Sequence, residues 1–242
     1  ACARLERDLK RVRETLAPLV NLADFEKPWL AKLNPFGEAA FIDRPIDMKG
    51  DLSDPLWSKA GPLGNFGNGS SVPEDPTEVR LLYTDEALYV GFTCYESHMD
   101  KITAVRTERD SNVWQDDSVE VFLNPDSLLL PWWQFIVNVN GVQFDGVQQA
   151  GAEFDSSWNG DWQAATARTA DRWTAEIRIP FSTLGLDGRQ KGRIWMCNFA
   201  RNDKANDRLE RQGWAEYETS SYGAEPRGSL HDTRKFRPIL FR

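Results

Sequence analysis

Apolar and polar positions alternate through most of the chain after residue 76, and this pattern predicts short β-strands. In residues 87–95 the apolar Leu88, Val90, Phe92 and Cys94 fall at every second position, so they share one face of a strand. Residues 77–83 form its partner, because Asp85-Glu86 between them favours a hairpin turn. Similar runs predict further strands at 102–106, 118–123, 132–140, 163–168, 172–179, 192–201 and 235–241.

About ten short strands with turn residues between them predict an all-β fold. We expect an antiparallel β-sandwich of the jelly-roll type, with short helical turns at residues 54–57 and 180–185. The long polar connection at residues 202–234 contains no strand-like run. Long loops on a rigid sheet often carry binding residues, so this connection is a place to look for them.

The start of the chain follows another pattern. Its apolar residues recur at spacings of three and four: Leu5, Leu9, Val12, Leu16 and Leu19. This spacing predicts an amphipathic helix, and the irregular Pro-containing segment after it predicts a linker. We therefore divide the chain into a helical N-terminal extension at residues 1–45 and a β-sandwich domain at residues 46–242. The helix could pack on the domain or form a dimer contact.

Composition and charge narrow the possible functions. The chain has ten Trp in 242 residues, more than a core needs, since each buried indole N–H requires a partner. Exposed aromatic platforms are therefore expected. A net charge of −8 argues against a nucleic-acid partner and is compatible with neutral sugars and with calcium. No apolar run approaches the length of a membrane span. We interpret the sequence as a mature secreted, periplasmic or cell-surface protein.

Cysteine usage predicts no zinc site, because none of the three cysteines forms a CxxC pair. Cys94 and Cys197 both fall in apolar strand patterns. We expect them to be buried free thiols rather than a disulfide.

The segment RDSNVWQDDSVEVFLN, residues 109–124, combines an aromatic ring with carboxylates. Trp114 precedes the predicted strand, where a side chain at a sheet edge can face water. On the strand, Ser118, Glu120 and Phe122 share one face, and the intervening apolar residues face the core. Sugar recognition needs this mixture, because a flat ring covers the C–H face of a pyranose while polar groups bind its hydroxyls.

A single Trp is too little for such a site. Covering on the order of 50 Å² of apolar surface contributes only ~1 kcal/mol. Millimolar affinity already requires about 4 kcal/mol. A second platform or several charge-assisted hydrogen bonds must therefore share the site.

Six segments together are similar to one known family: GDLSDPLW at 50–57, TEVRLLYTDEALYVGFTCYE at 77–96, NVWQDDSVEVFLN at 112–124, QFIVNVNG at 134–141, WMCNFARND at 195–203 and HDTRKF at 231–236. From about Met48 to Phe241 the chain resembles family 9 carbohydrate-binding modules. These are calcium-containing β-sandwich domains attached to xylanases and other polysaccharide-degrading enzymes. The resemblance implies non-catalytic binding of a polysaccharide or oligosaccharide, in an accessory role in polysaccharide degradation.

The resemblance also implies a site. In described members two Trp clamp the sugar, and polar residues form a rim. Trp114 matches the first clamp Trp and Glu120 a rim carboxylate, but Leu230 stands at the second clamp position. Ile136 replaces a rim Arg and Ala200 a rim Gln. The expected carbohydrate-binding residues are Trp114, Glu120, Asn138, Asn198, Arg201 and Trp214, with Tyr217 or Tyr222 as alternatives to Trp214 for the second platform.

For structural calcium the resemblance implies carboxylate ligands, and Asp51, Asp54 and Asp232 are available. Hard oxygen ligands suit this ion. Solvated turn aspartates are the alternative interpretation of each.

Two other functions remain open. A glycoside-cleaving enzyme needs two carboxylates at a defined separation, which Asp116, Asp117, Glu120 and Asp161 could supply. A haem-binding sandwich would use Met48, Met99, Met196 or His98 as ligands. The sequence contains no nucleophile elbow, phosphate loop or dinucleotide motif, and we assign no catalytic residue.

Overall fold

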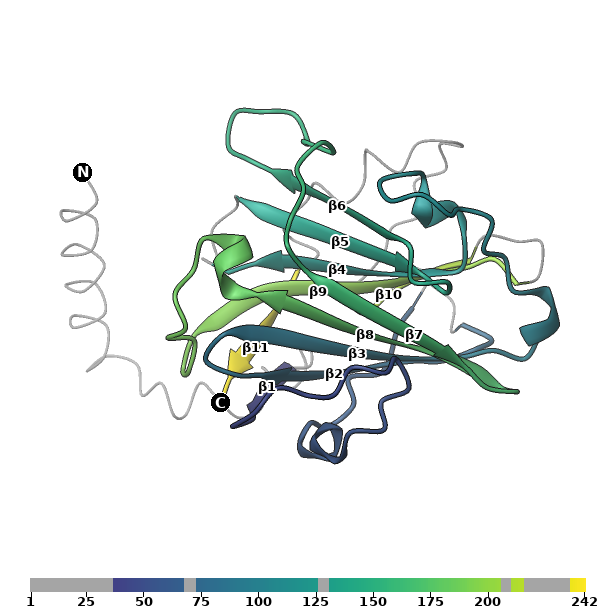
Figure 1. The fold of residues 1–242 in the computed structure, drawn as a ribbon, viewed down its shortest axis with the longest axis horizontal. Coiled ribbons are helices and arrows are strands. Elements are labelled where there is room, and N and C mark those ends of the chain that lie inside the picture. The colour runs from purple at the N-terminus through teal and green to yellow at the C-terminus, as the bar shows by residue number, and fades with distance from the viewer. Residues whose placement is uncertain (1–36, 68–72, 126–130, 206–209, 216–235) are drawn as a thin grey trace, which may run out of the picture. The chain divides into compact units, whose positions relative to one another are not determined.

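The computed structural model describes residues 37–67, 73–125, 131–205, 210–215 and 236–242, and these residues form a single eleven-stranded sheet (Figure 1). The strand order is β6-β5-β4-β9-β11-β1-β2-β3-β8-β7, and β10 pairs with β9. The strands are β1 (Gly37–Phe41), β2 (Thr77–Tyr83), β3 (Ala87–Tyr95), β4 (Ser118–Asn124), β5 (Trp132–Asn138), β6 (Gln143–Gln148), β7 (Gln163–Arg168), β8 (Arg172–Pro180), β9 (Ile194–Asp203), β10 (Glu210–Gly213) and β11 (Arg237–Phe241). The 3₁₀ helices are η1 (Pro55–Lys59), η2 (Met99–Lys101), η3 (Val113–Gln115) and η4 (Phe181–Leu184).

Strand β1 joins the two halves of the sandwich. It pairs in parallel with β11 on one side and with β2 on the other, while every other described pair of strands is antiparallel. We call β6-β5-β4-β9-β11, with β10, sheet A and β2-β3-β8-β7 sheet B. The all-β prediction is confirmed. The sandwich begins at Gly37, before the boundary we set at residue 46, and the predicted N-terminal helix lies outside the described residues.

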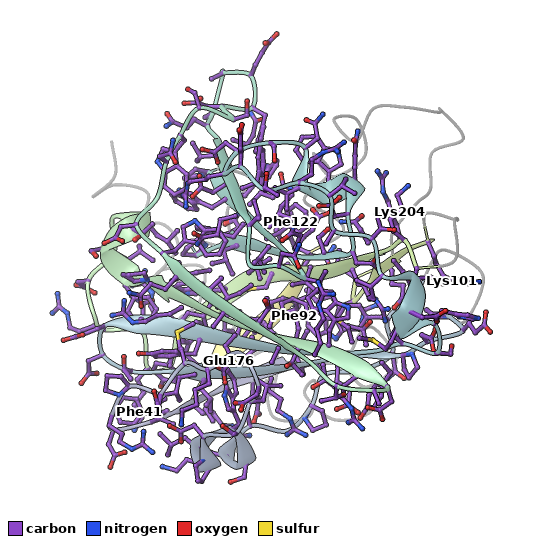
Figure 2. The ribbon with its side chains drawn as sticks, turned by 45° about the vertical axis from the view of Figure 1, so that its right-hand side comes forward. Phe41, Phe92, Lys101, Phe122, Glu176 and Lys204 are labelled. Atoms are coloured by element: carbon purple, nitrogen blue, oxygen red, sulfur yellow. The ribbon has the colours of Figure 1, made fainter. Side chains whose placement is uncertain are left out.

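The main core lies between the two sheets. Phe92 of sheet B meets Phe199 of sheet A edge to face, with ring centroids 6.2 Å apart. Figure 2 shows Phe92 between Phe122, on the outer side of sheet A, and Glu176, on the outer side of sheet B. Cys94 and Cys197 are free and buried, as predicted, and burial raises the pKa of the Cys94 thiol to about 12.

The sequence did not predict strands β1, β6 and β10. The strand predicted at residues 102–106 is absent. Residues 102–106 run without a strand partner because carboxylates take the place of the backbone ladder. The N–H of Thr103 donates to Asp117 and that of Arg106 to Asp116, at 2.7 and 2.9 Å. The predicted helical turns are present as η1 and η4. In the part of the chain that the structure describes, no helix is long and apolar enough to cross a membrane.

Candidate functional site

Glu120 lies at the centre of a polar row on the outer face of sheet A. Its cross-strand neighbours are Ile136 on β5 and Ala200 on β9. The side chain is buried, and each carboxylate oxygen accepts one hydrogen bond. Gln134 Nε2 donates to Oε2 at 2.7 Å, and Asn202 Nδ2 donates to Oε1 at 2.6 Å. The carboxylate thereby fixes the orientation of both amides.

The charge of this row is balanced only in part. Burial raises the pKa of Glu120, while the two amide hydrogen bonds and the nearby Arg211 lower it. Arg211 lies on β10 opposite Asn202, and its Nε is buried without a hydrogen bond to any described residue. The side-chain carbonyl of Gln134, which is partly exposed, likewise accepts no hydrogen bond from a described residue. In this row the Gln134 carbonyl is therefore the group placed to accept a hydrogen bond from a ligand, while Arg211 Nε is shielded from the surface.

Two partly exposed aromatic rings, Trp114 and Phe154, lie on this face beside the polar row. Trp114, on η3, meets Phe144 edge to face with centroids 5.1 Å apart. Phe154 stacks on Trp132 at 5.4 Å, with 22° between the ring planes. Both rings pack against the small cluster formed by Val113, Ile136 and Phe144. The predicted Trp114 platform is thus placed on the outer face of sheet A, together with a second ring.

Phe154 was missed because it lies in an irregular loop, without the alternation that marks strand residues. The loop is held to β6 by two backbone hydrogen bonds between Val147 and Asp155, at 3.1 and 2.9 Å. Gly146 makes room for the ring, since a Cβ there would lie 2.4 Å from Phe154 Cζ. A glycine within a strand indicates close approach of another group, but this signal becomes readable only once residues 143–148 are known to form β6.

Arg201 and Trp214 require correction, because neither lies on the face that carries Glu120. Successive strand residues point to opposite faces, so Arg201 points away from the face shared by Ala200 and Asn202. Its guanidinium is fully buried and pairs with Glu96 and Asp203, at 2.7 and 3.0 Å. Trp214 is buried in the main core against Phe199, with ring centroids 5.6 Å apart. Leu230, Tyr217 and Tyr222 lie outside the described residues.

Asn138 and Asn198 are buried and engaged in holding the backbone. Asn138 Nδ2 donates to Asp116 Oδ2 at 2.9 Å, and its Oδ1 accepts from two N–H groups of the following turn. Asn198 Oδ1 accepts from the backbone N–H groups of Phe199 and Ala215, at 2.8 and 2.9 Å. These contacts hold the turn after β5 and the segment after β10, and a role in sugar contact stays a prediction for both.

The two described residues proposed for calcium, Asp51 and Asp54, do not form a ligand set. Both oxygens of Asp54 bond to the Arg44 guanidinium, at 2.9 and 3.0 Å, and this contact holds the pKa of Asp54 well below its usual range. Asp51 is exposed and caps the N–H of Ser53 at 3.0 Å. Asp232 lies outside the described residues. With a cation already on Asp54, the described side chains do not fit calcium there, and we assign it no role.

A buried acidic cluster does exist elsewhere, between the sheets. Oxygen atoms of Glu96, Asp117 and Asp203 lie within 4.8 Å of one another, and Arg201 bonds to Glu96 and Asp203. Arg201 therefore supplies a positive charge to these carboxylates. Asp117 also accepts the backbone N–H groups of Thr103 and Lys204, at 2.7 and 3.0 Å.

The geometry bears on the two alternative functions. Asp117 accepts hydrogen bonds from Thr103 and Lys204 in the acidic cluster, whereas Glu120 lies on the outer face of sheet A. These two carboxylates therefore do not face each other across a shared cleft. The three methionines pack in three different clusters, Met48 beside the small core under η1, Met99 at the main core and Met196 on the outer face of sheet A. No two of them form a ligand pair.

Stability should depend on pH through Asp117. Burial raises its pKa to about 6, so between about pH 4 and pH 6 the folded state holds this proton more tightly than the unfolded state. We expect the free energy of unfolding to be about 1 kcal/mol higher at pH 5 than at pH 7 from this residue alone. Urea titrations at the two pH values measure it, and Asp117→Asn should reduce the difference. An equal difference in the variant would contradict the assignment.

Comparison with known proteins gives one family match and several similar structures. The family model described as "Carbohydrate family 9 binding domain-like" matches residues 46–236. An extracellular protein of Arthroderma benhamiae is 22% identical over 188 residues, covering 70% of this chain and 80% of the relative. A proposed carbohydrate-binding protein from Bacteroides uniformis has a TM-score of 0.67 at 15% identity, over 85% of this chain and 98% of that one. A family 9 module from Caldicellulosiruptor kristjanssonii, solved with cellotriose, has a TM-score of 0.60 at 18% identity, over 86% and 94%. The same kind of module solved with glucose has a TM-score of 0.57 at 18% identity, over 84% and 94%.

Proposed function

The chain belongs to the carbohydrate family 9 binding domain-like family, and on this premise we propose that it binds a neutral polysaccharide or oligosaccharide, without cleaving it, on the outer face of sheet A. One observation carries the choice of face. Trp114 and Phe154 pack on the same cluster beside a row in which Glu120 fixes the amides of Gln134 and Asn202.

The two rings meet the energetic requirement better than Trp114 alone. If each covers on the order of 50 Å² of a sugar face, together they contribute ~2–3 kcal/mol. Millimolar binding needs about 4 kcal/mol, so hydrogen bonds must supply the rest. The side-chain carbonyl of Gln134, which is partly exposed, suits a hydroxyl group of the sugar. Glu120 acts as a positioning residue in this arrangement.

Two structures of similar modules guide the choice of ligand class. Modules of the same fold have been solved with cellotriose and with glucose, which supports a β-glucan as the first ligand to test. The fungal relative is described as extracellular, which supports a location outside the cell. We propose an accessory role, in which the domain holds an associated activity on its polysaccharide.

Replacing either ring should weaken binding. We expect Trp114→Ala and Phe154→Ala each to reduce the affinity for cellohexaose or xylohexaose by about tenfold, equivalent to ~1.4 kcal/mol. Phe41→Ala is the matched control, because Phe41 is an exposed ring on β1, away from this face. Isothermal titration and affinity electrophoresis in soluble glucan and xylan measure the effect. Unchanged retention of both variants would rule out this face, and release of reducing sugar by the wild type would favour the enzyme alternative.

A further inference from the structure

A groove of about 570 Å³ lies on the outer face of sheet B, across the core from Trp114 and Phe154. Its floor is formed by β2, β3 and β8, and its wall by the segment at residues 50–59, which includes η1. Figure 2 shows Glu176, beneath this wall, on the opposite side of Phe92 from Phe122. The volume lies within the range of small-molecule sites, about 300–1,000 Å³.

The wall of the groove is fixed rather than loosely draped over the sheet. Glu176 is fully buried and accepts three hydrogen bonds from the wall segment, from the N–H groups of Gly50 and Leu52 and from Trp57 Nε1, at 2.8, 3.1 and 2.9 Å. Gly91 lets the wall approach, since a Cβ there would lie 2.6 Å from Leu52 and 2.9 Å from the Trp57 ring. A wall held in this way presents a preformed groove.

The floor carries polar groups that make no hydrogen bond to a described residue. These are the hydroxyl groups of Thr93 and Tyr95 and the carboxylate of Glu78, which attracts the Arg172 guanidinium electrostatically without a hydrogen bond. At the Glu120 row, by contrast, the carboxylate oxygens are both engaged. Free donors and acceptors at the bottom of a groove are placed to bind a polar ligand.

An aromatic surface accompanies these groups. The Arg172 guanidinium lies over the Tyr95 ring, with Cζ 4.8 Å from the centroid, and is held there by Asp171 at 2.6 and 2.9 Å. Arg80, also in the lining, donates to the Ala60 carbonyl at 2.5 Å. The lining includes two arginines and two carboxylates, so their formal charges cancel. A neutral ligand with many hydroxyl groups fits a charge-balanced, partly aromatic groove better than an ion does.

We infer that this groove is a second binding site, for a short neutral oligosaccharide, on the sheet opposite the Trp114 face. The inference rests on the proposed function and extends it from one site to two. Sites on opposite faces cannot bind the same short oligosaccharide, but they can bind two neighbouring chains of a polysaccharide. Each site would then raise the effective concentration of ligand at the other, so weak sites combine into stronger retention on the polymer.

Amide chemical shifts of the ¹⁵N-labelled protein, titrated with cellohexaose and xylohexaose, test this site separately from the first. We expect Trp114→Ala to lose the ligand-induced changes in chemical shift around η3 and β4 and to keep the changes around Thr93 and Thr174. Tyr95→Ala should do the reverse, with the dissociation constant at the sheet B groove rising by at least about tenfold. Glu78→Gln, a substitution on the partly exposed floor, gives a second variant should Tyr95→Ala fail to fold, and it should weaken the same shifts.

The outcomes separate the two proposals. Shifts confined to the Trp114 face, unchanged by Tyr95→Ala and Glu78→Gln, would overturn the second site and leave the proposed function standing. Shifts confined to the sheet B groove would support this inference and reject the Trp114 face. Absence of shifts at both faces with both oligosaccharides would overturn both. On insoluble cellulose, the wild type should be retained more strongly than either Trp114→Ala or Tyr95→Ala.

Discussion

Arg201→Met should lower the free energy of unfolding by about 3–5 kcal/mol, the usual cost of removing one partner from a buried ion pair. Arg201 is fully buried and is bonded to Glu96 and Asp203, with Asp117 beside them. Without the guanidinium, three buried carboxylates would share a site beside which the described residues place only the His98 imidazole, 3.8 Å from Glu96. Met fills most of the lost volume, so the expected loss comes mainly from charge.

Urea denaturation followed by tryptophan fluorescence measures this loss. Arg189→Met is the matched control, because the Arg189–Asp187 pair is exposed and its removal should not move the midpoint measurably. Burial already raises the pKa of Glu96 and Asp117, and removal of Arg201 should raise them further. Lowering the pH from 7 to 5 should therefore restore part of the stability of Arg201→Met. An equal loss at both pH values would point to packing and contradict the electrostatic account.

The register of β9 explains why the sequence placed Arg201 at the wrong site. The family motif has a polar rim residue where this chain has Ala200, and the predicted site residue Arg201 comes next along β9. Because strand side chains alternate, a displacement of one residue moves a side chain to the other face of the sheet. Ala200 lies on the outer face, as the motif implies, and Arg201 points into the core region. The next residue along a strand points to the opposite face of the sheet, so it cannot replace a site residue on the first face.

Strands were predictable where one face is continuously apolar. Residues 87–95 and 172–179 alternate clearly because both pack on the core between the sheets, and they appear as β3 and β8. Strand β10 has the sequence Glu-Arg-Gln-Gly, pairs with β9 and bridges Gly67 through Gly213, so backbone hydrogen bonds define it and no apolar period marks it. The opposite error arose at residues 102–106, where carboxylates replaced the strand partner.

The candidate site likewise contains residues that a local motif indicates and residues that depend on long-range contacts. Trp114 and Glu120 belong to one local motif, and the structure places Glu120 on β4 of sheet A and Trp114 beside it on η3. Phe154 depends on a loop folding back over Gly146, a contact between segments that no local pattern encodes. The sheet B groove depends on Glu176 meeting the segment at residues 50–57 from far along the chain. Contacts of this kind become visible only in three dimensions.

Gly50→Ala tests that long-range contact and should be strongly destabilising. Gly50 has φ +83°, a region that costs an Ala residue about 1 kcal/mol or more. In addition, a Cβ would lie 2.4 and 2.5 Å from backbone atoms of Thr166 on β7, which cannot turn aside as a side chain can. The total should be on the order of 3 kcal/mol or more, in the range caused by overpacking.

Gly151→Ala separates the two causes, because Gly151 has φ +73° and nothing lies within 4 Å of its added Cβ. It should show only the conformational cost, measured by urea denaturation beside Gly50→Ala. Equal losses would mean that Gly50 is required for its φ alone and that β7 does not press on the wall segment. If Gly50→Ala is the more damaging, the segment is displaced, and its N–H bond to Glu176 and carbonyl bond from Thr174 weaken together. The sheet B groove should then lose oligosaccharide binding in conditions where the Trp114 face keeps it, because only that groove takes its wall from Gly50.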